Sequence, residues 1–149
     1  MTRGVRIGID VGTVRVGVAV SDPDAILATP LVTLARDRSA AEGCLPSDMA
    51  SIAEIVRERD AVEVVVGLPI TLAGTEGFAA VASRQYAQML AIAVDPVPIW
   101  MADERMSTAA ASRRLFERGV RGRRQRAVVD QAAAVEILQR RLDALRRQT

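Results

Sequence analysis

One carboxylate, Asp10, stands inside the first apolar run of the chain, which reads IGIDVGTVRVGVAVSD from Ile7 to Asp22. Its neighbours are β-branched residues and glycines, as in strands buried in a sheet. The short Gly12-Thr13 link divides the run, and SDPD forms a turn at its end, so the run predicts a β-hairpin. A charged side chain in such a run is costly unless something compensates it, so Asp10 requires an explanation from the rest of the chain.

The remaining sequence predicts three more strands and four helices. Strands are expected at 28–34, 62–69 and 97–104, and VEVVVGLP at 62–69 is apolar enough for a central strand buried on both faces. Helical spacing of apolar residues predicts helices at 49–56 with a cap from Ser47 or Asp48, at 82–93, after Ser107, and from about Ala127 to near the end. The order β-β-β-α-β-α-β-α-α predicts an α/β fold, a five-stranded mixed sheet with helices on both faces. At 149 residues, we expect one domain covering 1–149.

Composition excludes several classes of site. The chain has no histidine and one cysteine, Cys44, which argues against a zinc site, a histidine general base and an internal disulfide. The apolar run from Val62 to Leu68 is too short to cross a bilayer, and no charged-then-apolar leader opens the sequence. We therefore expect a soluble, cytoplasmic protein that does not contact a membrane.

Three acidic positions stand out on this framework. Asp10 ends the first strand, Glu104 follows Asp103 at the end of the fifth, and Asp130 lies in the first turns of the last helix. Strand ends in an open α/β sheet are where sites form. If the three carboxylates converge, Mg²⁺ or Mn²⁺ would relieve their repulsion most simply, because these ions prefer hard oxygen ligands.

Each acid also has a simpler interpretation. Asp10 could end its strand by accepting hydrogen bonds from backbone amides, and Asp130 could stabilise the helix dipole by about 0.3 to 1 kcal/mol. Alternation along a strand sends Asp103 and Glu104 to opposite faces, so at most one of them is expected in the site.

Charge is distributed unevenly along the chain and indicates an anionic partner. Residues 1–104 carry 8 Arg against 14 acids, whereas residues 105–149 carry 12 Arg against 4 acids. The segment RGVRGRRQR at 118–126 predicts a cationic loop that holds phosphates through Arg121, Arg123, Arg124 and Arg126, with Arg15 as a further candidate contact. A merely solvated loop is the alternative. Trp100 is expected in the core, so recognition should follow backbone shape and charge.

Four motifs carry a family resemblance: GIDVGTVRVGVAVSD, VVVGLPITLAGTEG, ADERMST and VDQAAAVEIL. Together they resemble the YqgF (RuvX-like) nuclease family of the ribonuclease H-like superfamily. The resemblance implies a ribonuclease H-like sheet with its first three strands antiparallel, and a metal-dependent site in which Asp10, Glu104 and Asp130 are catalytic residues and metal ligands. Val14, where a lysine is common, and ITLAG depart from the family pattern and affect only local substrate contacts.

The family resemblance implies a Mg²⁺ or Mn²⁺-dependent phosphodiester hydrolase that acts on structured nucleic acid. Members have been described as nucleases that mature the 5′ end of pre-16S ribosomal RNA, a role in ribosome biogenesis, and as Holliday junction resolvases. Cutting a branched DNA junction symmetrically needs a homodimer, whereas a monomer could trim an RNA precursor.

Two other interpretations compete with this one. IDVGTVRVGVAV also resembles the phosphate-binding loop of sugar kinases, actin and ATP-dependent chaperones, but those proteins clamp ATP between two lobes and this chain has residues for one. A non-catalytic nucleic-acid-binding module is the remaining alternative if the acids do not converge.

Overall fold

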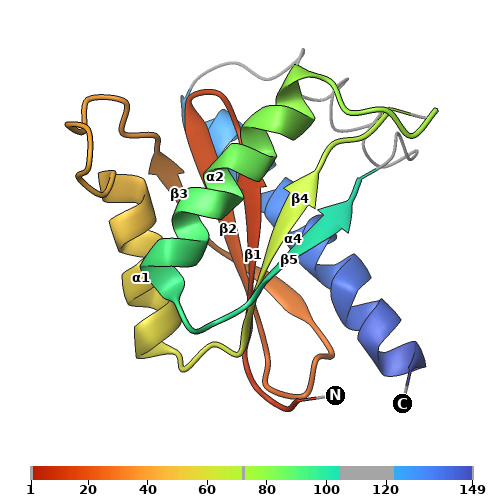
Figure 1. Cartoon of the computed structure of the whole chain (residues 1–149). Helices are drawn as coiled ribbons and strands as arrows, with labels where there is room; N and C mark the ends of the chain where they lie inside the picture. Colours follow the sequence, from red (N-terminus) through yellow and green to blue (C-terminus); the bar gives the residue numbers. More distant parts are fainter. Residues whose placement is uncertain (1, 72, 105–122, 149) are drawn as a thin grey trace.

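The structure is a computed structural model that describes residues 2–71, 73–104 and 123–148, the last segment with side chains from Val129 onward. Its sheet has five strands in the order β3-β2-β1-β4-β5 (Figure 1). The strands are β1 (Arg6–Val11), β2 (Arg15–Ser21), β3 (Ala28–Ala35), β4 (Glu63–Leu68) and β5 (Ile99–Asp103). The β1–β2 and β2–β3 pairs are antiparallel, and β1–β4 and β4–β5 are parallel. The predicted mixed sheet is confirmed, including its antiparallel first three strands.

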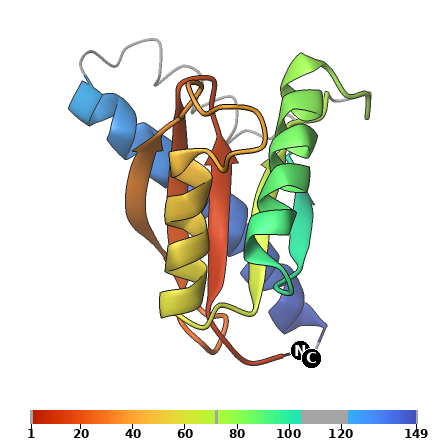
Figure 2. The same cartoon turned by 60° about the vertical axis from the view of Figure 1, so that its left-hand side comes forward.

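Helices cover both faces of this sheet, as predicted. Helices α1 (Ser47–Glu58) and α2 (Phe78–Val94) lie on one face, and α4 (Arg123–Arg147) crosses the other (Figures 1 and 2). Both ends of the chain lie at the same end of the molecule (Figures 1 and 2). The helix predicted after Ser107 lies outside the described residues.

The two faces are built from different residues, because side chains alternate along each strand. The face under α1 and α2 presents large β-branched and aliphatic side chains such as Ile7, Ile9 and Val64. The face under α4 presents small ones: a Cβ added at Gly8 would lie 2.7 Å from the Leu138 Cβ atom. Glycine in the strand therefore lets α4 lie close to the sheet.

Two sequence predictions about helix starts are wrong. Helix α1 has Pro46 at its N-cap position and no side-chain cap, and Asp48 is buried, accepting a 2.6 Å hydrogen bond from the Tyr86 hydroxyl. The Ser47 N–H donates instead to the Asp37 carboxylate in the preceding loop, at 3.0 Å. Helix α4 begins at Arg123, so the last four residues of the predicted cationic loop, 123–126, are helical.

The predicted burial of Trp100 is also wrong. This side chain is 47% exposed, and the Arg141 guanidinium lies over its ring, 3.9 Å from the centroid. Strand β5 is an edge strand, so its α4-facing side is only partly covered. No helix in the described part of the chain is long and apolar enough to cross a membrane.

Candidate functional site

Asp10 lies on the α4 face of the sheet, between two glycines. In the register it pairs with Gly17 on β2, and the last β1–β4 pair, Ile9 with Val66, places Gly67 next to Asp10 on the other side. Gly8 faces α4, so alternation turns Asp10 to the same face. The side chain is half-buried. Because neither glycine has a side chain, space remains on both sides of Asp10 for groups from other elements.

Helix α4 brings Asp130 to this position because it crosses β2 at Gly17. A Cβ on Gly17 would lie 2.1 Å from the Asp130 carbonyl oxygen, so only glycine allows this approach. The Asp130 side chain is 15% exposed, and its Oδ2 atom accepts a 2.7 Å hydrogen bond from the Arg15 Nε atom. Asp130 therefore carries an ion pair rather than serving only the helix dipole.

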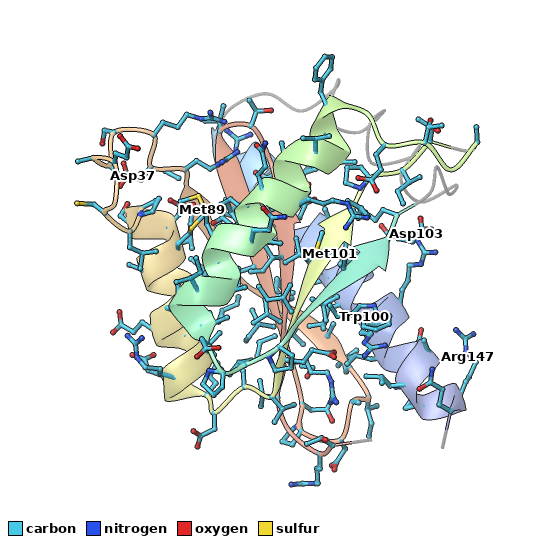
Figure 3. The ribbon with its side chains drawn as sticks, in the orientation of Figure 1. Asp37, Met89, Trp100, Met101, Asp103 and Arg147 are labelled. Atoms are coloured by element: carbon cyan, nitrogen blue, oxygen red, sulfur yellow. The ribbon has the colours of Figure 1, made fainter. Side chains whose placement is uncertain are left out.

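Strand β5 brings Glu104 to the other side of Asp10. Met101 packs with the core under α1 and α2, whereas Ala102 packs with the core under α4. Alternation therefore turns Asp103 toward the α2 side, where it is exposed at the strand end (Figure 3), and Glu104 toward α4. The Glu104 Oε2 atom lies 2.9 Å from the place that a Cβ on Gly67 would occupy. The Glu104 carboxylate thus lies over the α4 face, and alternation turns the exposed Asp103 the other way.

The β1–β2 turn beside Asp10 is held by arginines from the loop after β3. The Arg36 N–H donates to the Val14 carbonyl at 2.8 Å, and the Arg36 Nη1 atom donates to the Gly12 carbonyl at 3.2 Å. The Arg38 Nη2 atom donates to the Thr13 carbonyl at 2.6 Å. These contacts fix the strand end that carries Asp10. Nothing in the sequence pattern of the hairpin indicated them, because both arginines come from a distant loop.

The chemistry of the three carboxylates fits a hard divalent cation. Within the described residues, no group of three or more His, Cys, Asp or Glu residues is arranged to hold a metal ion as it stands. One of the three candidates, Asp130, is instead paired with Arg15. The donor types and the glycines around Asp10 suit a metal, while the third carboxylate is engaged by a protein cation.

The predicted phosphate contacts have different outcomes. Arg15, expected to meet phosphate, contacts Asp130. Arg121 lies outside the described residues, and so do the side chains of Arg123, Arg124 and Arg126, although the last three belong to α4. The roles of Gly17 and Gly67 were missed. A usable signal existed, since a lone glycine within a β-branched strand often marks the close approach of another backbone.

Comparisons with known proteins give consistent results. A family model described as "RuvX: Holliday junction resolvase" matches residues 4–144. A relative from Frankia casuarinae is 57% identical over 142 residues, covering 95% of this chain and 68% of the relative, and one from Nocardia farcinica is 55% identical over 141 residues, covering 95% and 78%. Both bear the name "Putative pre-16S rRNA nuclease".

Solved structures resemble the fold. RuvC of T. thermophilus in complex with a Holliday junction substrate matches with a TM-score of 0.53 and 15% identity, covering 95% of this chain and 94% of that chain. A second Thermus thermophilus RuvC structure matches with a TM-score of 0.51 and 16% identity, covering 94% and 95%. At these identities the likeness concerns the arrangement of strands and helices.

Proposed function

This chain belongs to the RuvX family and is a nuclease with a ribonuclease H-like fold, and we propose that Asp10, Glu104 and Asp130 form its metal-dependent catalytic site. The observation that carries the proposal is the row across the sheet in which Gly17, Asp10 and Gly67 lie side by side. Asp130 crosses over the first glycine, and the Glu104 carboxylate lies over the second. The residues that carry the three carboxylates, on β1, directly after β5 and on α4, therefore lie around one strand end, which supports the proposal.

The three carboxylates share one task in this proposal. Asp10, between the other two, would hold the cofactor, Mg²⁺ or Mn²⁺, together with Glu104 and Asp130. When bound, such ions activate a water and stabilise the leaving oxygen of a phosphodiester. The rigid β1–β2 turn holds Asp10 in place, and the arginines near the start of α4, namely Arg121, Arg123, Arg124 and Arg126, bind the phosphates that the acids would otherwise repel.

The proposed substrate is the 5′ end of pre-16S ribosomal RNA, cut by an endonuclease in the cytoplasm. The names of the Frankia casuarinae and Nocardia farcinica relatives support it. The alternative is a four-way DNA junction cut by a homodimer, and the description of the matching family model supports that one. A monomer suffices for the RNA substrate, whereas symmetrical cutting of a junction needs two sites.

One experiment tests the function and chooses between substrates. The purified protein is offered a pre-16S RNA fragment with its 5′ precursor and a four-way DNA junction of similar length, each with Mn²⁺, and the cut positions are mapped. We expect cleavage of the RNA within the precursor, and none by the Asp10→Asn protein. Paired cuts across the junction with intact RNA would favour the resolvase alternative. Cleavage of neither substrate by the folded wild-type protein would contradict the proposed function.

A further inference from the structure

Arg15 and Asp130 form a partly buried ion pair that joins β2 to α4. Arg15 is the first residue of β2, two positions before Gly17, so its side chain lies on the α4 face with Asp10. Its Nε atom donates to Asp130 Oδ2 at 2.7 Å, with the arginine side chain 28% exposed and the aspartate side chain 15% exposed. A guanidinium thus lies beside Asp130 on the face of the sheet that also carries Asp10.

We propose that Arg15 is an internal counter-ion that occupies Asp130 in the metal-free protein and leaves it for a substrate phosphate when the metal binds. This inference rests on the proposed function, because it assumes that Asp130 is a metal ligand. It adds Arg15 as a positioning residue and couples metal binding to substrate binding. The divalent ion and Arg15 compete for the Asp130 carboxylate, and this competition ends when Arg15 donates to a substrate phosphate instead.

The geometry of the contact supports an exchange rather than a permanent clamp. A guanidinium has five N–H donors in a planar fork that matches carboxylate and phosphate alike. Among the described residues, Arg15 uses only its Nε donor, on one oxygen of Asp130. The two terminal amino groups can therefore donate to a phosphate oxygen before the first contact breaks. Because the arginine is the more exposed member of the pair, it can turn toward an incoming strand.

The electrostatics explain why such a counter-ion is useful. Asp10, Glu104 and Asp130 repel one another, and like charges held together raise the cost of keeping all three ionised. A cation on Asp130 lowers this cost when no metal is bound. The same positive charge opposes a divalent ion, so the metal should bind more tightly once Arg15 has moved onto a phosphate.

The test measures Mn²⁺ affinity by the electron paramagnetic resonance signal of the free ion, without nucleic acid. We expect Arg15→Gln to bind Mn²⁺ on the order of tenfold more tightly than wild type, because the competing charge is gone. Arg15→Lys, which keeps the charge, should lie close to wild type. The control is Arg3→Gln, which removes the same charge from the exposed Arg3–Asp24 pair before β1, at the end of the strands opposite Asp10.

A second arm measures binding of the pre-16S RNA fragment in EDTA, where no cleavage occurs. Arg15→Gln should bind it several-fold more weakly than wild type, while Arg3→Gln should match wild type. Unchanged or weaker Mn²⁺ affinity in Arg15→Gln, or unchanged RNA affinity, would overturn the exchange.

The design separates failure of this inference from failure of the proposed function. If wild type binds Mn²⁺ and Asp130→Asn weakens that binding while Arg15→Gln leaves it unaltered, the carboxylate site stands and the counter-ion role falls. If wild type binds no Mn²⁺, or Asp130→Asn binds it as well as wild type does, both proposals fall.

Discussion

Two partly buried carboxylates on the α4 face of the sheet are compensated in different ways. Glu63, at the start of β4, accepts two hydrogen bonds from the fork of Arg141 on α4, at 3.1 and 2.9 Å. The buried Arg6 on β1 adds a second cation 3.3 Å from Glu63 Oε1, although its Nε atom lacks hydrogen-bond geometry there. Asp130 has a single contact to Arg15 among the described residues.

The difference distinguishes a structural pair from an exchangeable one. Both carboxylate side chains are similarly exposed, 12% for Glu63 and 15% for Asp130, so burial alone does not separate them. Glu63 is bound by a bidentate fork that ties α4 to β4, an arrangement that is strong and geometrically specific. Asp130 keeps one oxygen outside its contact with Arg15. The number of donors, rather than depth, indicates which carboxylate can take another ligand.

The largest expected effect is on catalysis, at Asp10, which lies on the same face of the sheet as these pairs. Asp10→Asn keeps the size of the side chain and removes a charged ligand, so Mn²⁺-dependent cleavage should fall by about three orders of magnitude. The fold should persist, and metal-free stability should not fall, because one repelling charge is gone. Cleavage rates and thermal melts in EDTA check both parts. A wild-type cleavage rate would remove Asp10 from the site.

The adjacent acids of β5 test whether the α4 face alone carries the chemistry. Glu104 faces α4 and Asp103 faces away, so Glu104→Gln should reduce the cleavage rate at saturating substrate by at least about a hundredfold. Asp103→Asn is the matched control and should change it by less than about threefold. Equal losses would mean that both carboxylates contribute, so that the side of the sheet to which each one points does not define the site.

The structural pair should show the opposite pattern, a loss of stability with intact chemistry. Glu63→Gln leaves the buried Arg6 and the half-buried Arg141 without their carboxylate, which should cost about 3 kcal/mol of the free energy of unfolding. Urea unfolding measures this cost, and the cleavage rate of the remaining folded protein should be near wild type. Asp130→Asn should do the opposite: the free energy of unfolding should stay near wild type, and the cleavage rate should fall. Similar stability losses in both variants would erase the distinction between the pairs.

The arginines near the start of α4 extend the comparison to the substrate. If Arg121, Arg123 and Arg124 each contact a phosphate, changing all three to Gln should flatten the slope of log K against log salt by roughly 2 to 3 units on duplex DNA. Affinity should fall similarly on unrelated sequences, and cleavage at saturating substrate should fall much less. Arg140→Gln with Arg147→Gln, at the other end of α4, is the control. An unchanged slope in the triple variant would mean that these arginines do not contact phosphates and that the cationic surface lies elsewhere.

The smallest expected effect concerns a carboxylate bound by backbone donors instead of arginine. The Ser47 backbone N–H and the Ser39 side chain lower the pKa of Asp37 to about 2. A lowered pKa stabilises the fold above the usual value of 3.8, and this contribution is lost as the pH falls through about 2. Asp37→Asn should therefore melt slightly below wild type at neutral pH, and the gap should close between pH 3.8 and about 2. A gap independent of pH would contradict this.

Much of the fold could be predicted because β-branched or apolar runs, bounded by turn residues, mark the strands. The start of α4 was missed because Gly122 and the arginines around it resemble a loop. Arginine is a good helix former, however, and the helix begins at Arg123. The cap of α1 was missed because Asp37 is ten residues from Ser47 along the chain. Trp100 was misplaced because apolar character does not reveal that β5 lies at the sheet edge.

The positions of the candidate acids could be predicted more fully than their partners. Strand ends and alternation indicated Asp10 and Glu104, and the first turns of the last helix indicated Asp130, since these follow from local pattern. The pairing of Arg15 with Asp130 joins residues far apart in sequence, so no local pattern contains it. The close crossing at Gly17 was visible in the sequence only as an interruption of a β-branched run.

The central claim is that Asp10, Glu104 and Asp130 share a metal ion, and anomalous scattering from crystals grown with MnCl₂ tests it most directly. The account predicts an anomalous peak bounded by these three carboxylates, with metal–oxygen distances of about 2.0 to 2.2 Å, and with Arg15 no longer on Asp130. A peak at another carboxylate such as Glu63, or no peak beside Asp10 at saturating Mn²⁺, would contradict it.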